Sequence, residues 1–205
     1  MGLPSRTMWA RRNIDVSQPN GFATSAIQLA ASYFSWGNVD GHNPNVDDFS
    51  PYDWGSGNAA EPYSSSPGAT IAFPGSLDDA HDCARVICGA PWRVPRNSDF
   101  SELIGNCDYV DANGDIISGD NKLITIDGVV GIRLRSRLNG NILFFAACGQ
   151  ASGLTLANGN EQGYYWSSVL RTDAQAELLF ITSSRVYVSG SNRFHGVQVR
   201  PIFRI

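Results

Sequence analysis

The sequence predicts an α+β fold in which two short helices precede a run of mostly antiparallel strands with long irregular loops. Three observations lead to this prediction. Apolar residues recur at helical spacing between residues 76 and 107, the period changes to two after residue 108, and Asn-Gly pairs separate alternating segments. The chain has 205 residues, 42% of them hydrophobic, so we expect residues 1–205 to bury a core as a single domain.

The two predicted helices are separated by a Gly- and Pro-containing segment. The first follows Ser76-Leu-Asp-Asp, which resembles a capping box, and Gly89 ends it. Its apolar face comprises Ala80, Cys83, Ala84 and Ile87. The second begins at Asn97 or Ser98 and carries Asp99 near its positive end. Its apolar face comprises Phe100, Leu103, Ile104 and Cys107.

The strands are predicted from alternation and from turn chemistry. The Asn-Gly pair at 139–140 predicts a hairpin between residues 130–137, where Arg alternates with apolar residues, and residues 142–147. A second Asn-Gly pair lies at 113–114. Further strands are expected at residues 164–169, 176–182, 185–188 and 197–203.

Residues 37–75 are rich in Gly, Asn, Ser and Pro and too irregular for a helix or strand. They nevertheless carry several aromatic side chains, so we expect a long loop that is fixed onto the core. These side chains are Phe49, Tyr52, Trp54, Tyr63 and Phe73.

The charge composition argues against two classes of partner. Only 17% of the residues are charged, Lys122 is the single lysine among fifteen basic residues, and the net charge is −4. No basic stripe is available to gather phosphates, so we expect no binding of nucleic acid. No segment approaches the roughly 20 apolar residues that cross a bilayer, and the N-terminal residues lack the apolar run of a secretory signal. We therefore expect no membrane insertion and no signal peptide.

The four cysteines are Cys83, Cys88, Cys107 and Cys148. They are too sparse for a disulfide framework, and none forms a Cys-x-x-Cys pair. We expect small buried thiols, with one disulfide as the alternative.

The sequence offers little support for catalysis. His42, His81 and His195 are far apart, and the chain lacks the HExxH, GxSxG, GxGxxG and P-loop motifs. We therefore expect a protein that is not an enzyme and has no cofactor.

Asp111, Asn113 and Asp115 have the carboxylate and amide spacing of the first half of a calcium-binding loop. Ile116 and Lys122 stand where such a loop requires Gly and Glu. Two interpretations stay open: an Asn-Gly hairpin turn, which the sequence favours, and a weak cation site.

The C-terminal third carries the main functional hypothesis. In residues 177–182, apolar side chains occupy both faces of the expected strand. Either this strand is buried on both sides, or Leu178, Phe180 and Tyr187 point outward as an exposed binding surface. The flanking loops, residues 170–173 and 189–195, mix adaptable polar residues with aromatics, as paratopes do.

Several segments resemble one family. Residues 92–104 resemble its "WRLPT..E...L" signature, residues 163–168 its "GYYWSS" strand and residues 196–202 its terminal "G..VRPV". Leu3-Pro-Ser and residues 9–13 and 33–37 add to the likeness. Together these segments resemble the Fibrobacter succinogenes major paralogous domain, a C-type lectin-like fold that is common in gut bacteria and their phages. The resemblance implies this fold for nearly the whole chain.

Some members of that family are variable proteins of diversity-generating retroelements, whose C-terminal codons are rewritten at adenines to diversify a ligand-binding face. Asn codons rewritten in this way cannot encode Glu, Gln, Lys, Met or Trp. Between Val169 and Val197 only Gln175 and Glu177 belong to that set. The resemblance thus implies that residues 163–205 form a variable, ligand-binding part.

The family pattern also assigns inward and outward positions. Leu179, Ile181 and Val186 align with core positions, and Trp92, Trp166 and Arg200 are expected inside, with Arg200 bonded to backbone carbonyls. The outward, ligand-binding positions are expected to be Leu170, Arg171, Thr172, Asp173, Leu178, Phe180, Thr182, Arg185, Tyr187, Ser189, Ser191, Phe194 and His195.

The expected function is recognition of a protein or glycan on a host or neighbouring cell, from a phage tail or fibre tip or from a bacterial cell surface. The alternative is an invariant adhesion or cell-surface structural module of the same fold, and a formylglycine-generating type of enzyme is a distant third. The Glu-Pro-Asn, Gln-Pro-Asp and Trp-Asn-Asp motifs of calcium-dependent sugar binding are absent. Both a monomer and a homo-oligomer are compatible with the sequence.

Overall fold

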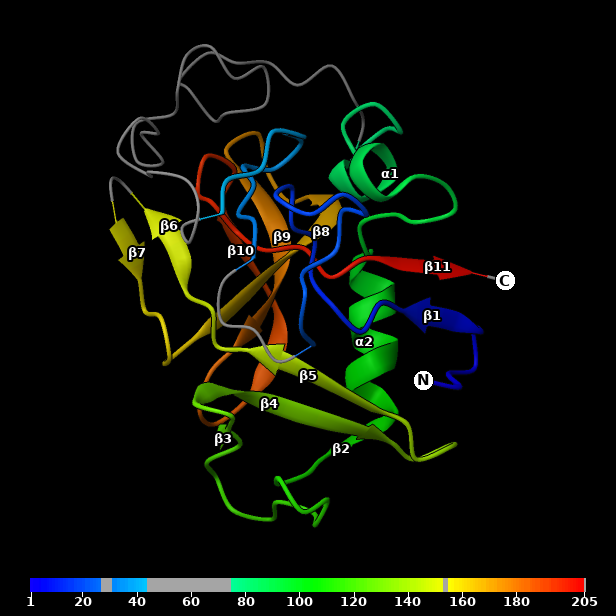
Figure 1. Cartoon of the computed structure of the whole chain (residues 1–205), viewed down its shortest axis with the longest axis vertical. Helices are drawn as coiled ribbons and strands as arrows, with labels where there is room; N and C mark the ends of the chain where they lie inside the picture. Colours follow the sequence, from blue (N-terminus) through cyan, green and yellow to red (C-terminus); the bar gives the residue numbers. More distant parts are fainter. Residues whose placement is uncertain (27–30, 44–74, 153–154, 205) are drawn as a thin grey trace.

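A computed structural model describes residues 1–26, 31–43, 75–152 and 155–204. These residues form mostly antiparallel strands with two short helices, which confirms the α+β class (Figure 1). The loop aromatics expected between Phe49 and Phe73 lie outside the described residues. None of the described helices has the length and apolar character needed to cross a membrane.

The strands of the described chain form four small sheets. The first pairs β1 (Thr7–Trp9) with β11 (Ile202–Arg204), and the second has the order β10-β9-β8 (Val186–Asn192, Gln175–Ile181, Gly163–Leu170). The third comprises β2 (Cys107–Tyr109), β3 (Ile124–Ile126), β4 (Val129–Ser136) and β5 (Ile142–Ala146), and the fourth pairs β6 (Gln150–Ser152) with β7 (Thr155–Ala157).

Helix α1 (Cys83–Cys88) begins later than predicted. Its N-cap is Asp82, whose carboxylate accepts a hydrogen bond from the Arg85 backbone N–H at 3.0 Å. The expected start at Ser76 is wrong because Asp78 instead closes a separate turn, in which it accepts from the His81 backbone N–H at 3.0 Å. The predicted end at Gly89 is confirmed, and this residue has a φ of 76°.

Helix α2 (Asn97–Gly105) begins where the sequence predicts. The Asp99 carboxylate accepts from the Arg96 backbone N–H at 2.8 Å, as the third residue of a capping box does. Phe100 and Leu103 are buried as expected, whereas Cys107 lies in β2 rather than on the helix.

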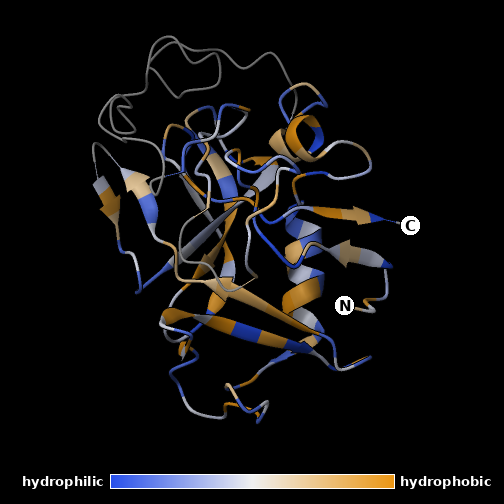
Figure 2. Cartoon of the chain, viewed as in Figure 1, coloured by the Kyte–Doolittle hydropathy of each residue, from blue (hydrophilic) through white to orange (hydrophobic). Residues whose placement is uncertain are grey.

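The predicted hairpin at 139–140 is confirmed, since β4 and β5 pair in antiparallel register from Gly131↔Ala146 to Arg135↔Ile142. Strand β4 is central in the third sheet. Strand β5 pairs with one edge of β4, and β3 and β2 pair with successive parts of its other edge. The hydrophobic and hydrophilic residues of β4 alternate along the ribbon (Figure 2). The sheet therefore buries one face of β4 and turns its arginines outward.

The β10-β9-β8 sheet is buried on both sides around Leu178 and Leu179 of its middle strand. On one side, Leu179 and Ile181 of β9 belong to the same core cluster as Phe100 of α2. On the other, Leu178 joins a second cluster that includes Phe34, Val197 and Val199. The burial of Leu179, Ile181 and also Val186 confirms the core positions that the family pattern assigns.

The segment expected to be a strand at 197–203 is only partly one. Val197 and Gln198 make isolated bridges to Phe34 and Tyr165, and the regular strand β11 starts at Ile202. The strands that were not predicted are β1, β2, β3, β6 and β7. Each has three residues, which is too short for alternation to be distinctive.

Arg200 is 1% exposed and is bonded mainly to backbone oxygens, as expected. Its guanidinium donates to the carbonyls of Ala10, Arg11 and Phe144 at 3.4, 3.2 and 3.0 Å, and its Nε donates to Asn13 Oδ1 at 2.5 Å. Burial lowers the pKa of Arg200 to about 10, so the side chain still carries its charge at neutral pH.

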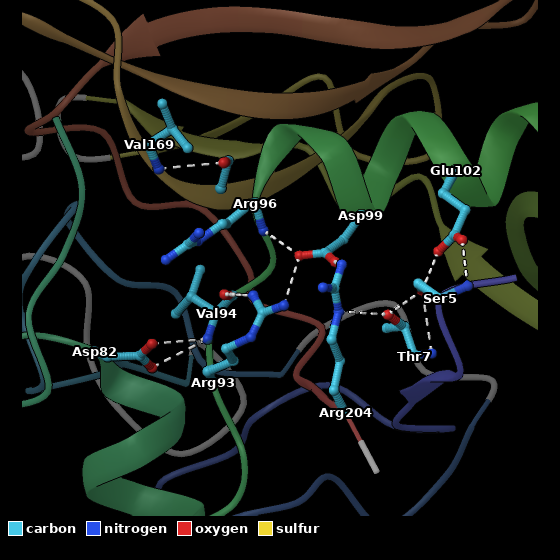
Figure 3. Close-up of polar contacts among 11 residues, drawn as sticks. Ser5, Thr7, Asp82, Arg93, Val94, Arg96, Asp99, Glu102, Val169 and Arg204 are labelled. Carbon is cyan, nitrogen blue, oxygen red and sulfur yellow. Dashed lines mark hydrogen bonds and ion pairs between the residues drawn. The ribbon is translucent and has the colours of Figure 1, made fainter. Parts of the chain in front are cut away.

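A second polar network joins the two chain ends to the helices (Figure 3). Asp99, 1% exposed, is 2.9 Å from Arg93 Nη2 and 3.3 Å from Arg204 Nη2. The Asp82 carboxylate accepts from the Val94 backbone N–H at 2.9 Å. Residues 93–94, within the first family-like motif, are therefore held between α1, α2 and β11.

Trp92 departs from the core role expected for it. It is half-buried and packs edge-on against Phe22 and Phe203, with ring centroids 5.2 and 4.8 Å away. Trp166 is 2% exposed as expected, and its Nε1 donates to the Phe34 carbonyl at 2.7 Å.

All four cysteines carry free thiols, which confirms the main interpretation of their spacing. Cys83, Cys107 and Cys148 are buried, and Cys88 is half-buried. Burial raises the pKa of Cys88 to about 12 and those of Cys107 and Cys148 to about 11.

Replacing Gly131 with Ala should destabilise the fold by about 1–3 kcal/mol. A Cβ at this position would lie 2.3 Å from the Phe145 carbonyl oxygen, a backbone atom of the paired strand that cannot move aside. Gly119→Ala is the matched control, since nothing lies within 4 Å of its Cβ. Urea unfolding measures both, and equal stability of the two variants would contradict the β4–β5 register.

In native protein at pH 8, we expect all four thiols to react slowly with a disulfide reagent such as DTNB. Their raised pKa values leave little thiolate at this pH, and the reactive fraction should increase only as the pH approaches 11. In guanidinium chloride the titration should reach four thiols per chain. A lower total would mean that a disulfide exists, and rapid reaction of the native protein would contradict the burial.

Candidate ligand-binding surface

Three aromatic rings and a guanidinium lie in one row across the β10-β9-β8 sheet. Tyr187 lies opposite Phe180, and Phe180 opposite Tyr164. Their ring centroids are 5.4 and 4.8 Å apart, and the Arg185 guanidinium lies 4.4 Å from the centroid of the Tyr187 ring. We call these four residues the aromatic–arginine row. It brings together three of the sequence-predicted positions, Phe180, Arg185 and Tyr187.

The row is accessible at its β10 end. Arg185 is exposed, Phe180 and Tyr187 are half-buried, and Tyr164 is 8% exposed. Edge-on and tilted ring contacts, together with the cation–π contact, hold the side chains in one arrangement before any ligand arrives. Such preorganisation lowers the entropy cost of binding.

Amide side chains border the row beside Tyr164. The Tyr164 hydroxyl donates to Gln162 Oε1 and accepts a hydrogen bond from Asn158 Nδ2 at 3.3 Å. Sequence reasoning did not assign these three residues to the surface. The alternation in residues 163–168 was the signal that could have found Tyr164, because it places Tyr164 and Trp166 on one strand face and Tyr165 on the other.

Leu178 is not part of the surface, and its predicted outward position is wrong. It is 1% exposed and lies between Trp166 and Ser189 in the sheet register. The physical reason is that the cluster containing Phe34 and Trp36 packs on this part of the sheet face. Around Leu178 the strand is buried on both sides, which was the alternative interpretation.

Ser191 is also more enclosed than expected. It is 9% exposed, and its Oγ lies 2.8 Å from His195 Nδ1 and 3.3 Å from Gln150 Oε1. Burial lowers the pKa of His195, which favours the neutral ring. The half-buried Phe194 lies edge-on to that ring at 4.7 Å. Residues 191–195 thus form a group of their own, in contact with β6, and Ser189 lies half-buried between this group and the row.

The residues predicted at 170–173 comprise Leu170, the last residue of β8, and the turn that follows it toward β9. Arg171, Thr172 and Asp173 are exposed, whereas Leu170 is half-buried and packs against the second core cluster. The Thr172 hydroxyl accepts from the Gln175 backbone N–H at 3.1 Å and so fixes the turn. Thr172 therefore has a structural role in this turn.

Arg171 lies on the other face of the sheet from the row. Its Nη1 is 4.0 Å from Glu177 Oε2, and its side chain passes so close to Gly190 that a Cβ there would meet Cδ at 2.5 Å. Glu177 and Gly190 are cross-strand partners three positions along their strands from Phe180 and Tyr187, and this odd spacing places them on the opposite face. A ligand on the row would therefore not contact Arg171 across this sheet face.

Thr182 positions the row from the β9–β10 turn. It is half-buried, its Oγ1 donates to the Arg185 carbonyl at 2.9 Å and it accepts from the Arg185 backbone N–H at 3.1 Å. The backbone of Arg185 is thus fixed, while its side chain stays exposed.

The segment containing Asp111, Asn113 and Asp115 has the contacts of a hairpin turn. One Asp111 carboxylate oxygen accepts from the Asn113 and Asp115 backbone N–H groups at 2.9 and 2.8 Å. The carbonyls of residues 111, 112 and 114 accept hydrogen bonds from Arg133 and Arg135. The Ile117 carbonyl, at the seventh position where such a loop supplies a backbone ligand, accepts a hydrogen bond from Lys122 Nζ at 3.0 Å. The described parts of the chain contain no group of three His, Cys, Asp or Glu side chains placed to hold a metal ion.

No protein-family model, curated protein sequence or solved structure matches this chain.

Replacing Leu178 with Ala should destabilise the protein by about 2–5 kcal/mol, because it would leave a cavity between Trp166 and the Phe34 cluster. Ser189→Ala is the control: Ser189 is the cross-strand neighbour of Leu178 and half-buried, so its loss should change stability by less than about 0.5 kcal/mol. Thermal or urea unfolding measures both. If Leu178→Ala were as stable as Ser189→Ala, the burial of Leu178 would be contradicted and its outward position supported.

Proposed function

We propose that this protein has a C-type lectin-like fold and binds a protein or glycan on a cell surface through its C-terminal β9–β10 hairpin. The aromatic–arginine row is the observation that carries the proposal. Large rings and arginine dominate binding energies at interfaces, and here they lie on an accessible sheet face in a fixed arrangement.

Contacts between the family-like motifs support the fold assignment. Residues 9–13 bind Arg200 of the terminal motif. The backbone of Ile202, in the same terminal motif, exchanges hydrogen bonds of 2.9 and 3.0 Å with the backbone of Arg93 in the 92–104 motif. The Trp166 backbone N–H of the "GYYWSS" motif donates to the Gln198 carbonyl at 3.0 Å. Segments that are far apart in the sequence thus form one internal frame, as motifs of a single domain would.

This internal frame would also tolerate changes in the exposed side chains of the β9–β10 hairpin between variants of the gene. Phe180, Arg185 and Tyr187 project from a hairpin whose opposite face is fixed by Leu179 and Ile181 in the core. Their replacement alters the exposed face and leaves the packing of the other face intact. This supports a variable protein of a diversity-generating retroelement, carried by a phage virion or a bacterial cell surface.

The gene neighbourhood separates this proposal from an invariant adhesion module. A reverse-transcriptase gene and a near-repeat of the 3′ coding end that differs at adenines are expected for the variable protein. A neighbourhood without either one favours the invariant module, whose binding surface would be the same hairpin.

The double replacement Arg185→Ala and Tyr187→Ala should weaken ligand binding at least tenfold, or about 1.4 kcal/mol. Both side chains are accessible, so the variant should keep its fold. Fluorescently labelled protein can be screened against a glycan array and a panel of gut bacterial cells, and the affinity for any hit can then be measured by biolayer interferometry.

Ile116→Ala is the control for this experiment, because Ile116 is 61% exposed at the 110–116 turn, outside the sheet that carries the row. It should bind like the unmodified protein. Unchanged affinity of the double variant for a ligand that the unmodified protein binds would exclude the row as the binding surface.

A further inference from the structure

A pocket of about 580 Å³ lies against the β1–β11 ribbon, away from the aromatic–arginine row. Phe22, Trp92 and Phe203 line it as a continuous series of edge-on rings. Met8 pairs with Phe203 across the ribbon and adds a thioether that is 38% exposed. The volume is within the range of sites that take small organic molecules.

The ribbon turns these side chains toward solvent. Thr7, Trp9 and Ile202 are buried, whereas Met8 and Phe203, one residue out of phase with them, face the opposite way. Exposed aromatic and apolar side chains grouped around a hollow are uncommon on soluble domains and mark interaction sites. The half-burial of Trp92 is part of this arrangement.

The rim of the pocket is positively charged. Arg11 and Arg12 line it, and no acidic side chain is among the described residues that do so. Arg12 uses one nitrogen to donate to the Ala23 carbonyl at 3.1 Å, whereas Arg11 is exposed. In a chain of net charge −4, this local excess of arginine favours an anionic ligand.

We propose that this pocket binds a small aromatic carboxylate. The ring of such a ligand matches the aromatic wall, and its carboxylate matches the planar, two-pronged donor geometry of arginine. A sugar acid fits less well, because Thr24 and Ser25 are the only hydroxyl side chains among the described lining residues. Most sugar hydroxyls would lose their hydrogen bonds to water against an apolar wall.

The test compares 3-phenylpropionate with its neutral amide by isothermal titration calorimetry on the full chain. The acid should bind about tenfold more tightly than the amide, as expected for charge-assisted hydrogen bonds to arginine. Arg11→Gln should remove that difference and leave amide binding unchanged. Trp92→Leu should weaken both ligands, and Met8→Ala tests the same wall at a more exposed position in case the Trp92 variant fails to fold.

Arg185→Gln is the matched control, because it removes a guanidinium from the aromatic–arginine row and not from this pocket. It should bind 3-phenylpropionate like the unmodified protein, so the outcome does not depend on the cell-surface function. Equal binding of acid and amide, no saturable binding of either, or tighter binding of glucuronate than of 3-phenylpropionate would each overturn the proposal.

Discussion

The structure depends on how one buried positive charge is satisfied. Arg200 is almost fully enclosed, and no ion pair to it occurs among the described residues, so oxygen atoms and the ring of Phe145 must replace its hydration. These oxygens come from residues 10–13 and from β5. The segment after β1, strand β5 and the segment before β11 therefore meet at one point around this side chain.

Local chemistry accounts for what could be predicted from the sequence. The 139–140 hairpin and the start of α2 at Asn97 each follow from residues within one turn. The buried positions Leu179 and Ile181 needed the family pattern as well, because alternation alone leaves open which face of the strand is buried. The predicted start of α1 was wrong because Asp78 and Asp82 both accept hydrogen bonds from backbone N–H groups as capping residues do. Only the tertiary contact of Asp82 with the Val94 backbone distinguishes them. Local pattern cannot supply that contact.

The wrong prediction at Leu178 also arose because contacts with distant parts of the chain cannot be read from a local pattern. Alternation identifies which residues share a face of β9, but the side chains that cover that face at Leu178 include Phe34, Val197 and Val199, which come from other segments of the chain. The same face is therefore covered at Leu178 and accessible at Phe180, two residues further along β9, and at Tyr187, the cross-strand partner of Phe180. A candidate surface drawn from alternation and the family pattern includes both Leu178 and Phe180. The segments that pack over Leu178 exclude it, and Phe180 stays accessible in the aromatic–arginine row.

The pairing of β1 with β11 brings residues 7–9 and 202–204 side by side, on the side of the molecule away from β6 and β7 (Figure 1). A carrier protein could be joined through either end and would stand at the same side of the domain. The domain could also be inserted into a loop of a host scaffold with little separation between the two junctions. This geometry suits the chain to engineered display, in which libraries at Arg185 and Tyr187 are selected while both attachment points stay fixed.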